Sequence, residues 1–514
     1  MNDSLFRDNP ILLKHFHSRL RKQHLLPFII VVVMLCGLFT WMGFSPQNSG
    51  YGIQVARYSA FYFIFGLQML LLFVIGASQV ATAVGAAREG GQLDFHRISP
   101  QSALSMAIGY LIGAPIRELI LFACTIPFYL LFWNLGSPFW NGMGLPILLL
   151  AMIPAVFFWY SLALLVALVA PKPRNVGVLI IVLVLAMHLL SSVPLFQHLT
   201  LVKTVMGTIS VPVERDSLGN IVSPFFSMPV PNVLLALLHQ LLIGFFCFYA
   251  AVRKLANERA FAFNRTVALA AFVLIVALIF GNILNADIYD DQITGRYSSG
   301  YANPESMVVI SLYYILALCL MLLTIVTPNK SEVIQGTRHA LKLGHSKMSF
   351  WEDRAPNHII LAIFTLLAGV FSFSAVLLFQ WFTAFHNPGR EIELSLLTTS
   401  VAIIMGAILL FGAAYQYFPL RFGKQGMNYL ALLLFILWVF PPICGIILSM
   451  LNNSQTSDYF FALSPLTSIG ATLSNSGSSN EQYALIATAV PWISGIVFFF
   501  MSRYESRKVM AEEV

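Results

Sequence analysis

Long apolar segments alternate with shorter polar stretches along the whole chain. Each apolar segment is close to the length of roughly twenty helical residues that crosses a bilayer. The first six segments are residues 25–42, 58–81, 103–135, 145–170, 176–193 and 233–252. The second six are residues 267–283, 307–326, 359–385, 394–417, 429–450 and 484–501. The pattern predicts an all-α polytopic membrane protein of about 12 transmembrane helices.

The segments form two sets of six, which predicts two transmembrane halves at residues 25–265 and 266–514. Residues 1–24 precede them and predict an amphipathic interfacial helix. Two informative inner stretches, 88–102 and 327–358, each follow the second segment of a set, which is typical of an internal duplication. Residue identity between the halves is low, so an undivided array of twelve helices is the alternative.

Composition agrees with a membrane protein. The 514 residues are 58% hydrophobic and 10% charged, with a mean hydropathy of +0.79. This apolar share exceeds that of soluble domains and excludes a protein that folds in water after secretion. The five cysteines fall inside apolar segments and do not form a disulfide or metal-binding motif. The first apolar run lacks a small-residue cleavage site, so we expect a retained helix and not a removed signal peptide.

Basic residues predict the orientation, because loops rich in Lys and Arg stay in the cytoplasm. With the N-terminus inside, the cytoplasmic stretches hold 23 of the 29 basic residues. The net charge of +7 then divides into +12 inside and −5 outside. We expect both termini in the cytoplasm and the chain in a bacterial inner (plasma) membrane. The positive charge is spread over seven short loops that face anionic lipid, so it does not indicate nucleic-acid binding.

Residues 9–22 begin with Asn9-Pro10 and continue as a basic amphipathic sequence. Four apolar positions recur there at helical spacing: Leu12, Leu13, Phe16 and Leu20. The pattern predicts a helix on the inner membrane surface. This helix either anchors the chain passively or docks a partner.

The next inner stretch reads Ala86-Ala-Arg-Glu-Gly-Gly-Gln-Leu-Asp-Phe-His-Arg-Ile-Ser-Pro100. Gly90 and Gly91 permit a sharp reversal of the chain, and Pro100 favours a helix start. Glu89 and Asp94 supply carboxylates at the cytoplasmic surface. Such a stretch can dock on a partner protein, and a plain polar connector is the alternative.

These residues resemble permeases of the type-2 (ABC-2) exporter class of ABC transporters. That family carries an acidic residue, a glycine, a hydrophobic–acidic pair and a Ser/Thr-Pro between its second and third helices. The matching positions are Glu89, Gly91, Leu93, Asp94, Ser99 and Pro100. The Asn9-Pro10 opening is also similar, and the likeness covers the first six helices but reaches the second six only by topology.

The sequence also departs from the family pattern. Gly90 and Gln92 replace the usual Lys or Thr near the glycine. His96 and Arg97 interrupt a run that is normally rich in leucine. These departures put the short motif itself in doubt, and its position after the second helix carries the resemblance.

The resemblance implies an export permease in which residues 89–100 couple to cytoplasmic ABC ATPase subunits. Further permease or accessory subunits fit the same interpretation. The sequence contains no GxxxxGK[ST], H-E-x-x-H or G-x-S-x-G pattern. We therefore expect a transporter subunit that is not an enzyme, holds no metal or cofactor, and depends on ATP bound by its partner.

Arg117 and Glu118 lie inside the third apolar segment, where charge is costly and usually faces protein or a cavity. Ser105, Gly109 and Gly113 recur every four residues and predict a small-residue packing stripe that leads to Arg117. The pair is an intramembrane polar candidate. Alternatively, the third helix begins later and the pair lies at the inner interface. An intramembrane carboxylate also leaves an ion-coupled secondary transporter open, whereas a membrane-embedded enzyme would need clustered polar residues that are absent.

Two other polar stretches allow structural predictions. Residues 327–358 are rich in basic and aromatic side chains and would form a second docking surface in a duplicated chain. Otherwise they form a lipid-surface loop with Phe350 and Trp351 at the interface. The outer residues 211–222 place two β-prone stretches around a turn-rich centre and predict a hairpin.

Overall fold

The computed structural model describes residues 9–45, 51–99, 101–132, 144–170, 172–189, 198–200, 222–226, 228–283, 304–345, 348–386, 394–451, 454–474 and 481–511. The chain divides into two compact units, Met1–Ala262 and Phe263–Val514, which we call unit 1 and unit 2.

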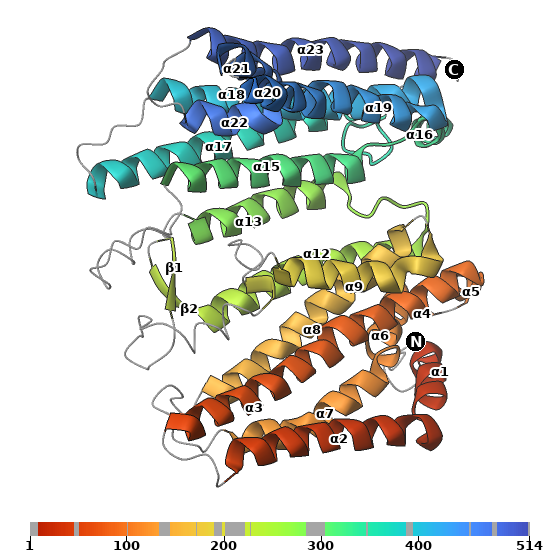
Figure 1. Ribbon diagram of the computed structural model, residues 1–514. Helices are drawn as coiled ribbons and strands as arrows, with labels where there is room; N and C mark the ends of the chain where they lie inside the picture. The colour runs from red at the N-terminus through yellow and green to blue at the C-terminus, as the bar shows by residue number, and fades with distance from the viewer. Residues whose placement is uncertain are drawn as a thin grey trace. The chain divides into compact units, whose positions relative to one another are not determined.

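Unit 1 consists of helices and one short hairpin (Figure 1). Its helices are α1 (Pro10–Arg19), α2 (Lys22–Phe44), α3 (Tyr51–Met69), α4 (Ala77–Glu89), α5 (Gln92–Ile98), α6 (Ala103–Gly113), α7 (Ile116–Leu131), α8 (Gly144–Val169), α9 (Val176–Leu189) and α12 (Asn232–Ala256). A π-helical turn, η1 (Leu70–Gly76), joins α3 to α4 without a break. Helix α8 packs along α12 and α4, and α2 packs against α3 and α7. Phe73, Ala81 and Trp159 lie in the resulting core.

The described secondary structure of unit 2 is helical, with turns and irregular stretches between the helices (Figure 1). Its helices are α13 (Arg265–Ile283), α15 (Pro304–Val326), α16 (Lys330–Lys342), α17 (His358–His386), α18 (Leu394–Phe422), α19 (Gly426–Leu434), α20 (Phe440–Met450), α21 (Ser454–Leu463), α22 (Pro465–Ser474) and α23 (Glu481–Ala511). A 3-10 turn, η4 (Gly423–Gln425), separates α18 from α19, and a π-helical turn, η5 (Phe435–Val439), joins α19 to α20. Helix α18 packs against α17, α22 and α23.

The described part of each predicted apolar segment is helical, apart from a turn that breaks the third segment. Among the described residues, nine helices are long and apolar enough to cross a membrane, or ten if the bent pair α6–α7 is one span. Helix α9 is apolar but shorter, and the 53-residue stretch Thr398–Met450 contains both α18 and α19–α20. The prediction of an all-α polytopic membrane protein is confirmed. The number of twelve spans stays a prediction.

The sequence pattern predicts one continuous helix for the third apolar segment, and this prediction is wrong. Helices α6 and α7 meet at an angle of 49°. Pro115 stands at the break and has no N–H for the carbonyl of Leu111, four residues earlier. The break places Arg117 and Glu118 in the first turn of α7.

The hairpin in unit 1 consists of β1 (Val222–Phe225) and β2 (Met228–Pro231), which pair antiparallel. The predicted hairpin at residues 211–222 lies outside the described residues except for Val222. The observed strands therefore follow the predicted ones in the chain and do not test them.

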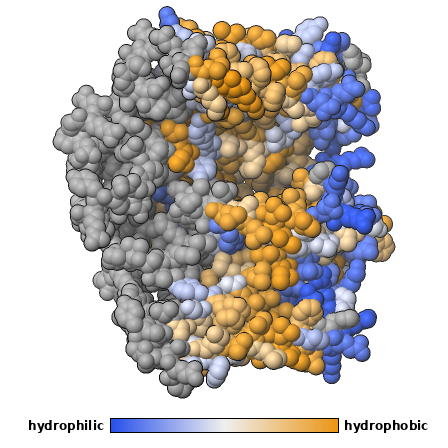
Figure 2. Space-filling model, viewed as in Figure 1, coloured by the Kyte–Doolittle hydropathy of each residue, from blue (hydrophilic) through white to orange (hydrophobic). Residues whose placement is uncertain are grey.

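In each unit, the surface is hydrophobic around the middle of the helices and hydrophilic at one end (Figure 2). In unit 1, hydrophobic residues cover the middle of the helices, and hydrophilic residues gather at the end that carries α1 and α5. In unit 2, hydrophilic residues gather at the end that carries α16. We call this the hydrophilic end of each unit. It is the end that the distribution of basic residues predicts to be cytoplasmic.

Candidate functional site

Helix α1 is held on unit 1 by Asn9, which is 2% exposed. The Asn9 Oδ1 atom accepts hydrogen bonds from the backbone N–H groups of Ile11 (3.1 Å) and Leu12 (3.2 Å), as N-cap residues do. Pro10 occupies the first helical position, where no N–H is needed. The Asn9 Nδ2 atom donates to the carbonyl of Ser105 at 2.6 Å. The Asn9-Pro10 pair therefore starts α1 and ties it to α6.

The small-residue stripe on α6 gives α1 the space to pack closely. A Cβ atom added at Gly109 would lie 2.9 Å from the Cβ of Ile11, and one added at Gly113 would lie 3.3 Å from the Cα of Leu12. A larger side chain at Gly109 would push α1 away. Ile11 and Leu12 form the buried face of α1, whereas Leu13, which the sequence pattern places in the apolar stripe, is 44% exposed.

The predicted coupling stretch folds as a helix, a glycine turn and a second short helix. Helix α4 ends at Glu89, which is exposed. Gly91 has a φ of +68°, in the left-handed region that glycine adopts at little cost, and α5 begins at the next residue. Leu93 is 2% exposed and belongs to the core of unit 1. The turn thus fixes one face of α5 in the core and leaves the other outside.

The outer face of α5 carries two large apolar side chains. Phe95 is 66% exposed and Ile98 is 84% exposed. They lie on a helix of seven residues at the hydrophilic end of unit 1 (Figure 2). Adjacent exposed apolar side chains rimmed by polar residues are typical of a contact surface.

Arg97 fixes α5 to the end of α12. Its guanidinium donates to the carbonyls of Leu255 (3.1 Å) and Lys254 (3.2 Å), which lie in the last turn of α12. The same group pairs with the carboxylates of Asp94 (2.6 Å) and Glu258 (3.3 Å). Because the last carbonyls of a helix lack partners inside it, Arg97 both completes α12 and holds α5.

Helices α1 and α5 meet at one further contact. The Lys14 ammonium donates to the Gln92 side-chain oxygen at 2.9 Å. The structure thus brings together the two segments that the sequence assigns to a partner interface. We call the exposed residues of both helices the α1–α5 surface: Lys14, Gln92, Asp94, Phe95 and Ile98.

Two histidines adjoin this surface. Burial lowers the pKa of His15 to about 4, and the charges of Arg19 and Lys14 add to the effect. Burial, followed by the charge of Lys14, also lowers the pKa of His96. Both imidazoles are therefore neutral near pH 7, and the positive charge here comes from lysine and arginine.

The remaining residues of the stretch are placed as follows. The Ser99 hydroxyl donates to the carbonyl of His96 at 2.7 Å, at the end of α5. Pro100 lies outside the described residues. Sequence reasoning treated Arg97 as a departure from a family pattern and missed its anchoring role. It also missed the contacts of Asn9 with α6, although an Asn-Pro start is a recognisable helix signal.

Arg117 and Glu118 form an ion pair at the break of the third segment. Glu118 is fully buried, and its Oε1 atom accepts from the Arg117 Nε (3.0 Å) and Nη2 (2.7 Å) atoms. Its Oε2 atom is buried without a hydrogen-bond partner in the described part of the chain. The Arg117 side chain is 25% exposed and lies 4.7 Å from the centre of the Phe28 ring. The carboxylate thus faces protein, while the arginine reaches the surface of unit 1.

The described ranges contain no group of three or more His, Cys, Asp or Glu side chains that could hold a metal ion.

Comparison of the chain with protein-family models, curated proteins and solved structures finds no match in any of the three.

Proposed function

We propose that the chain is the membrane-spanning permease subunit of an ATP-driven ABC transporter of the ABC-2 type, an exporter. A separate ATPase subunit docks on the α1–α5 surface. The observation that carries this proposal is the pair of exposed apolar side chains, Phe95 and Ile98, on a short helix that is fixed to the spanning helices. The likeness of residues 89–100 to the coupling stretch of that family supports the same assignment.

A displacement of α5 by a bound partner would be transmitted to two spanning helices. Helix α4 continues through η1 into α3, so the turn at Gly91 is the first change of direction on that path. Arg97 connects α5 to the last turn of α12. Closure of an ATPase pair on ATP would then shift the helices between inward-facing and outward-facing states.

The energy source must lie outside the chain. The sequence has no GxxxxGK[ST] loop to cradle phosphates. In this proposal the α1–α5 surface binds protein and not nucleotide. The mixed character of the surface, two apolar side chains beside a lysine and a carboxylate, suits a protein partner.

The test removes the exposed apolar side chains of α5 and leaves the buried residues of unit 1 unchanged. A double variant, Phe95→Ser with Ile98→Ser, should insert and assemble normally, because both side chains are exposed. It should lose copurification with the ATPase subunit and lose stimulation of ATP hydrolysis. Leu343→Ser is the matched control, since Leu343 is 60% exposed on the corresponding connection of unit 2.

Two outcomes would overturn the proposal. The double variant could bind the ATPase subunit and transport as well as the wild type, which would make α5 a plain connector or a lipid anchor. Transport could also continue in cells that lack every ATPase subunit of this class. The purified chain alone should bind no nucleotide, which equilibrium dialysis can measure.

An ion-coupled secondary transporter is the second candidate. The observation that favours it is the break between α6 and α7, which places a fully buried carboxylate at the start of a half-helix. Discontinuous helices with polar residues at the break are typical of ion and substrate sites in such transporters. Flux in proteoliposomes driven by an ion gradient without ATP, and abolished by Glu118→Gln, would favour this candidate over the first.

A further inference from the structure

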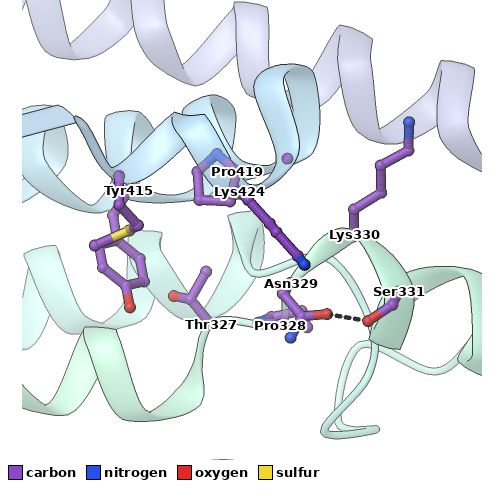
Figure 3. A pocket seen from close by; sticks show the side chains of 10 residues that line it. Thr327, Pro328, Asn329, Lys330, Ser331, Tyr415, Pro419 and Lys424 are labelled. Atoms are coloured by element: carbon purple, nitrogen blue, oxygen red, sulfur yellow. Dashed lines mark hydrogen bonds between the residues drawn. The ribbon is translucent and has the colours of Figure 1, made fainter. Parts of the chain in front are cut away.

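A cavity of about 530 Å³ opens at the hydrophilic end of unit 2 (Figure 3). One wall is the turn from α15 into α16, with Thr327, Asn329 and Lys330. The opposite wall is the end of α18 and the turn η4, with Tyr415 and Lys424. This volume falls in the range of small-molecule sites.

The charge of the cavity is positive. Lys330 and Lys424 line it from two separate elements, and no Asp or Glu is among its lining residues. In Figure 3, the Lys424 side chain extends across the cavity toward Asn329. Neither lysine forms an ion pair within the residues that the structure describes. The Lys330 side chain points away from Asn329 in the same view. Two lysines from separate elements, with no carboxylate in the lining, favour an anion at this cavity.

Glu332, two residues after Lys330 in the chain, is engaged at the start of α16. The Glu332 carboxylate accepts a hydrogen bond from the backbone N–H of Asn329 at 2.8 Å, and the Asn329 side chain accepts one from the Glu332 N–H at 3.0 Å. This capping box closes the start of α16. The Ser331 hydroxyl donates to the same Asn329 oxygen at 2.7 Å, as the dashed line in Figure 3 marks. The helix start is thus satisfied internally, and the lysine ammonium groups are the donors that a ligand would use.

The cavity also has apolar walls, formed by Pro328, Pro419 and Met427. Three large side chains near this wall are exposed: Phe422 at the end of α18 (43%), and Met427 (46%) and Tyr429 (42%) on α19. Helix α19 continues through η5 into α20 as an exposed apolar helix, which suits contact with lipid. A ligand here would meet cationic groups on one side and a lipid-facing surface on the other.

We propose that this cavity binds the phosphate group of an anionic phospholipid from the adjacent leaflet. Lys330 and Lys424 neutralise the phosphate, while the apolar walls and the outer face of α19 accept the glycerol and the first part of the acyl chains. Basic cavities between transmembrane helices bind anionic headgroups in this way. A soluble anion would use the lysines alone and leave the apolar walls without a partner.

The experiment measures lipid binding to the purified full chain by native mass spectrometry, with phosphatidylglycerol as the anionic probe and phosphatidylcholine as the neutral one. The double variant Lys330→Gln with Lys424→Gln should bind phosphatidylglycerol roughly thirtyfold more weakly, since each lysine near a membrane surface contributes roughly fivefold to the affinity. Phosphatidylcholine binding should be unchanged.

Two further variants separate the cavity from general surface charge. The control double variant, Lys172→Gln with Lys342→Gln, removes the same charge from exposed positions outside the cavity and should bind phosphatidylglycerol as the wild type does. The variant Lys330→Arg with Lys424→Arg retains the charge and should keep at least most of the binding.

Equal weakening by the cavity variant and the control variant would overturn the proposal, because binding would then follow net charge. Lysine-dependent binding of inorganic phosphate, with phosphatidylglycerol binding unaffected by the same lysines, would assign the cavity to a soluble phosphate and also overturn it. None of these readings depends on transport or on an ATPase subunit.

Discussion

Each unit contains an arginine–glutamate pair with a buried glutamate, and these two pairs differ in how they are built. In unit 1, Arg117 and Glu118 are neighbours in the first turn of α7, and the glutamate side chain is 1% exposed. In unit 2, Arg421 near the end of α18 pairs with Glu505 on α23 at 3.0 Å, and the glutamate side chain is 9% exposed. The arginine side chains are 25% exposed in unit 1 and 46% exposed in unit 2. The first pair is formed by neighbours in one turn, and the second joins two helices through a more exposed arginine. Both pairs hold a buried carboxylate, and the carboxylate of unit 1 is the more fully enclosed of the two.

The connections after the second span of each unit differ in a related way. In unit 1, Arg97 belongs to the connection and reaches out to carbonyls at the end of α12. In unit 2, Arg265 belongs to the first turn of α13 and donates to the carbonyls of Phe350 and Ala355 in the connection. In unit 2, therefore, the anchoring arginine lies on a spanning helix and not in the connection. The Asn357 Nδ2 atom also donates to the Thr327 hydroxyl at 2.7 Å and joins the two ends of the connection. Arginine secures the connection in both units, to a helix end in unit 1 and through loop carbonyls in unit 2. Both connections expose large apolar side chains: Phe95 and Ile98 on α5 in unit 1, and Leu343, Phe350 and Trp351 in unit 2.

The largest effect is expected from Arg117→Gln, which would leave the buried Glu118 carboxylate without its partner. Loss of one member of a buried pair costs about 3–5 kcal/mol. Arg421→Gln should cost less, about 1–2 kcal/mol, because the Arg421 side chain already faces solvent in part while Glu505 is buried. The double variant Arg117→Gln with Glu118→Gln should recover much of the loss, because no buried charge remains. Thermal unfolding followed by size exclusion in detergent measures all three. Equal losses for Arg117→Gln and Arg421→Gln would remove the distinction between the pairs.

The next effect compares the two anchoring arginines. Arg265 is 1% exposed, and its replacement by Gln would strip donors from two backbone carbonyls, at a cost of about 3 kcal/mol. The Arg97 side chain is 16% exposed, so water can replace part of its bonding and Arg97→Gln should cost about 1–2 kcal/mol. Limited proteolysis should cut the 343–357 region first in the Arg265 variant and the 90–99 region first in the Arg97 variant. Cleavage at the same place in both would show that these arginines do not anchor their own connections.

A smaller effect concerns the glycines at which both connections turn. Gly91 follows α4 with a φ of +68°, and Gly344 follows α16 with a φ of +75°. An added Cβ would meet no atom within 4 Å at either position, so only backbone strain remains. Alanine should cost about 1 kcal/mol at each site and asparagine less. If α5 couples to an ATPase subunit, Gly91→Ala should lower transport more than Gly344→Ala at equal stability. The opposite order would move the coupling role to unit 2.

The smallest effect is a pH dependence of α1. The pKa of His15 is about 4 in the folded chain and 6.5 in an unfolded one, so the unfolded state binds more protons between these values. The packing of α1 should therefore weaken as the pH falls from about 6.5 toward 4. Hydrogen exchange of the α1 amides should speed up in this window more in the wild type than in His15→Gln. Because His96 also has a lowered pKa, His96→Gln is the matched control. An unchanged pH profile in His15→Gln would assign the effect elsewhere.

Much of the fold could be predicted because lipid imposes a simple rule on sequence. Every backbone polar group in a bilayer must be satisfied internally, so each long apolar segment must be helical. The described part of every predicted segment is helical for this reason, apart from the turn that breaks the third segment. The break at Pro115 was missed because a proline inside an apolar run is compatible with either a kink or a new helix. The packing around α6 decides between a kink and a new helix. The hydropathy of the sequence carries no information about this packing.

The candidate site was predictable only in part. The glycine turn at Gly91 and the helix start at Asn9-Pro10 follow from local backbone preferences, so the sequence alone determined that a reversal and a capped helix lie there. The contact of Lys14 with Gln92 joins residues 78 positions apart, and that of Arg97 with the end of α12 joins residues more than 150 apart. Only tertiary structure decided these contacts, the full burial of Glu118 and the cavity with its two lysines. Each depends on which helices become neighbours, and hydropathy and local preference carry no information about neighbours that are distant in the chain.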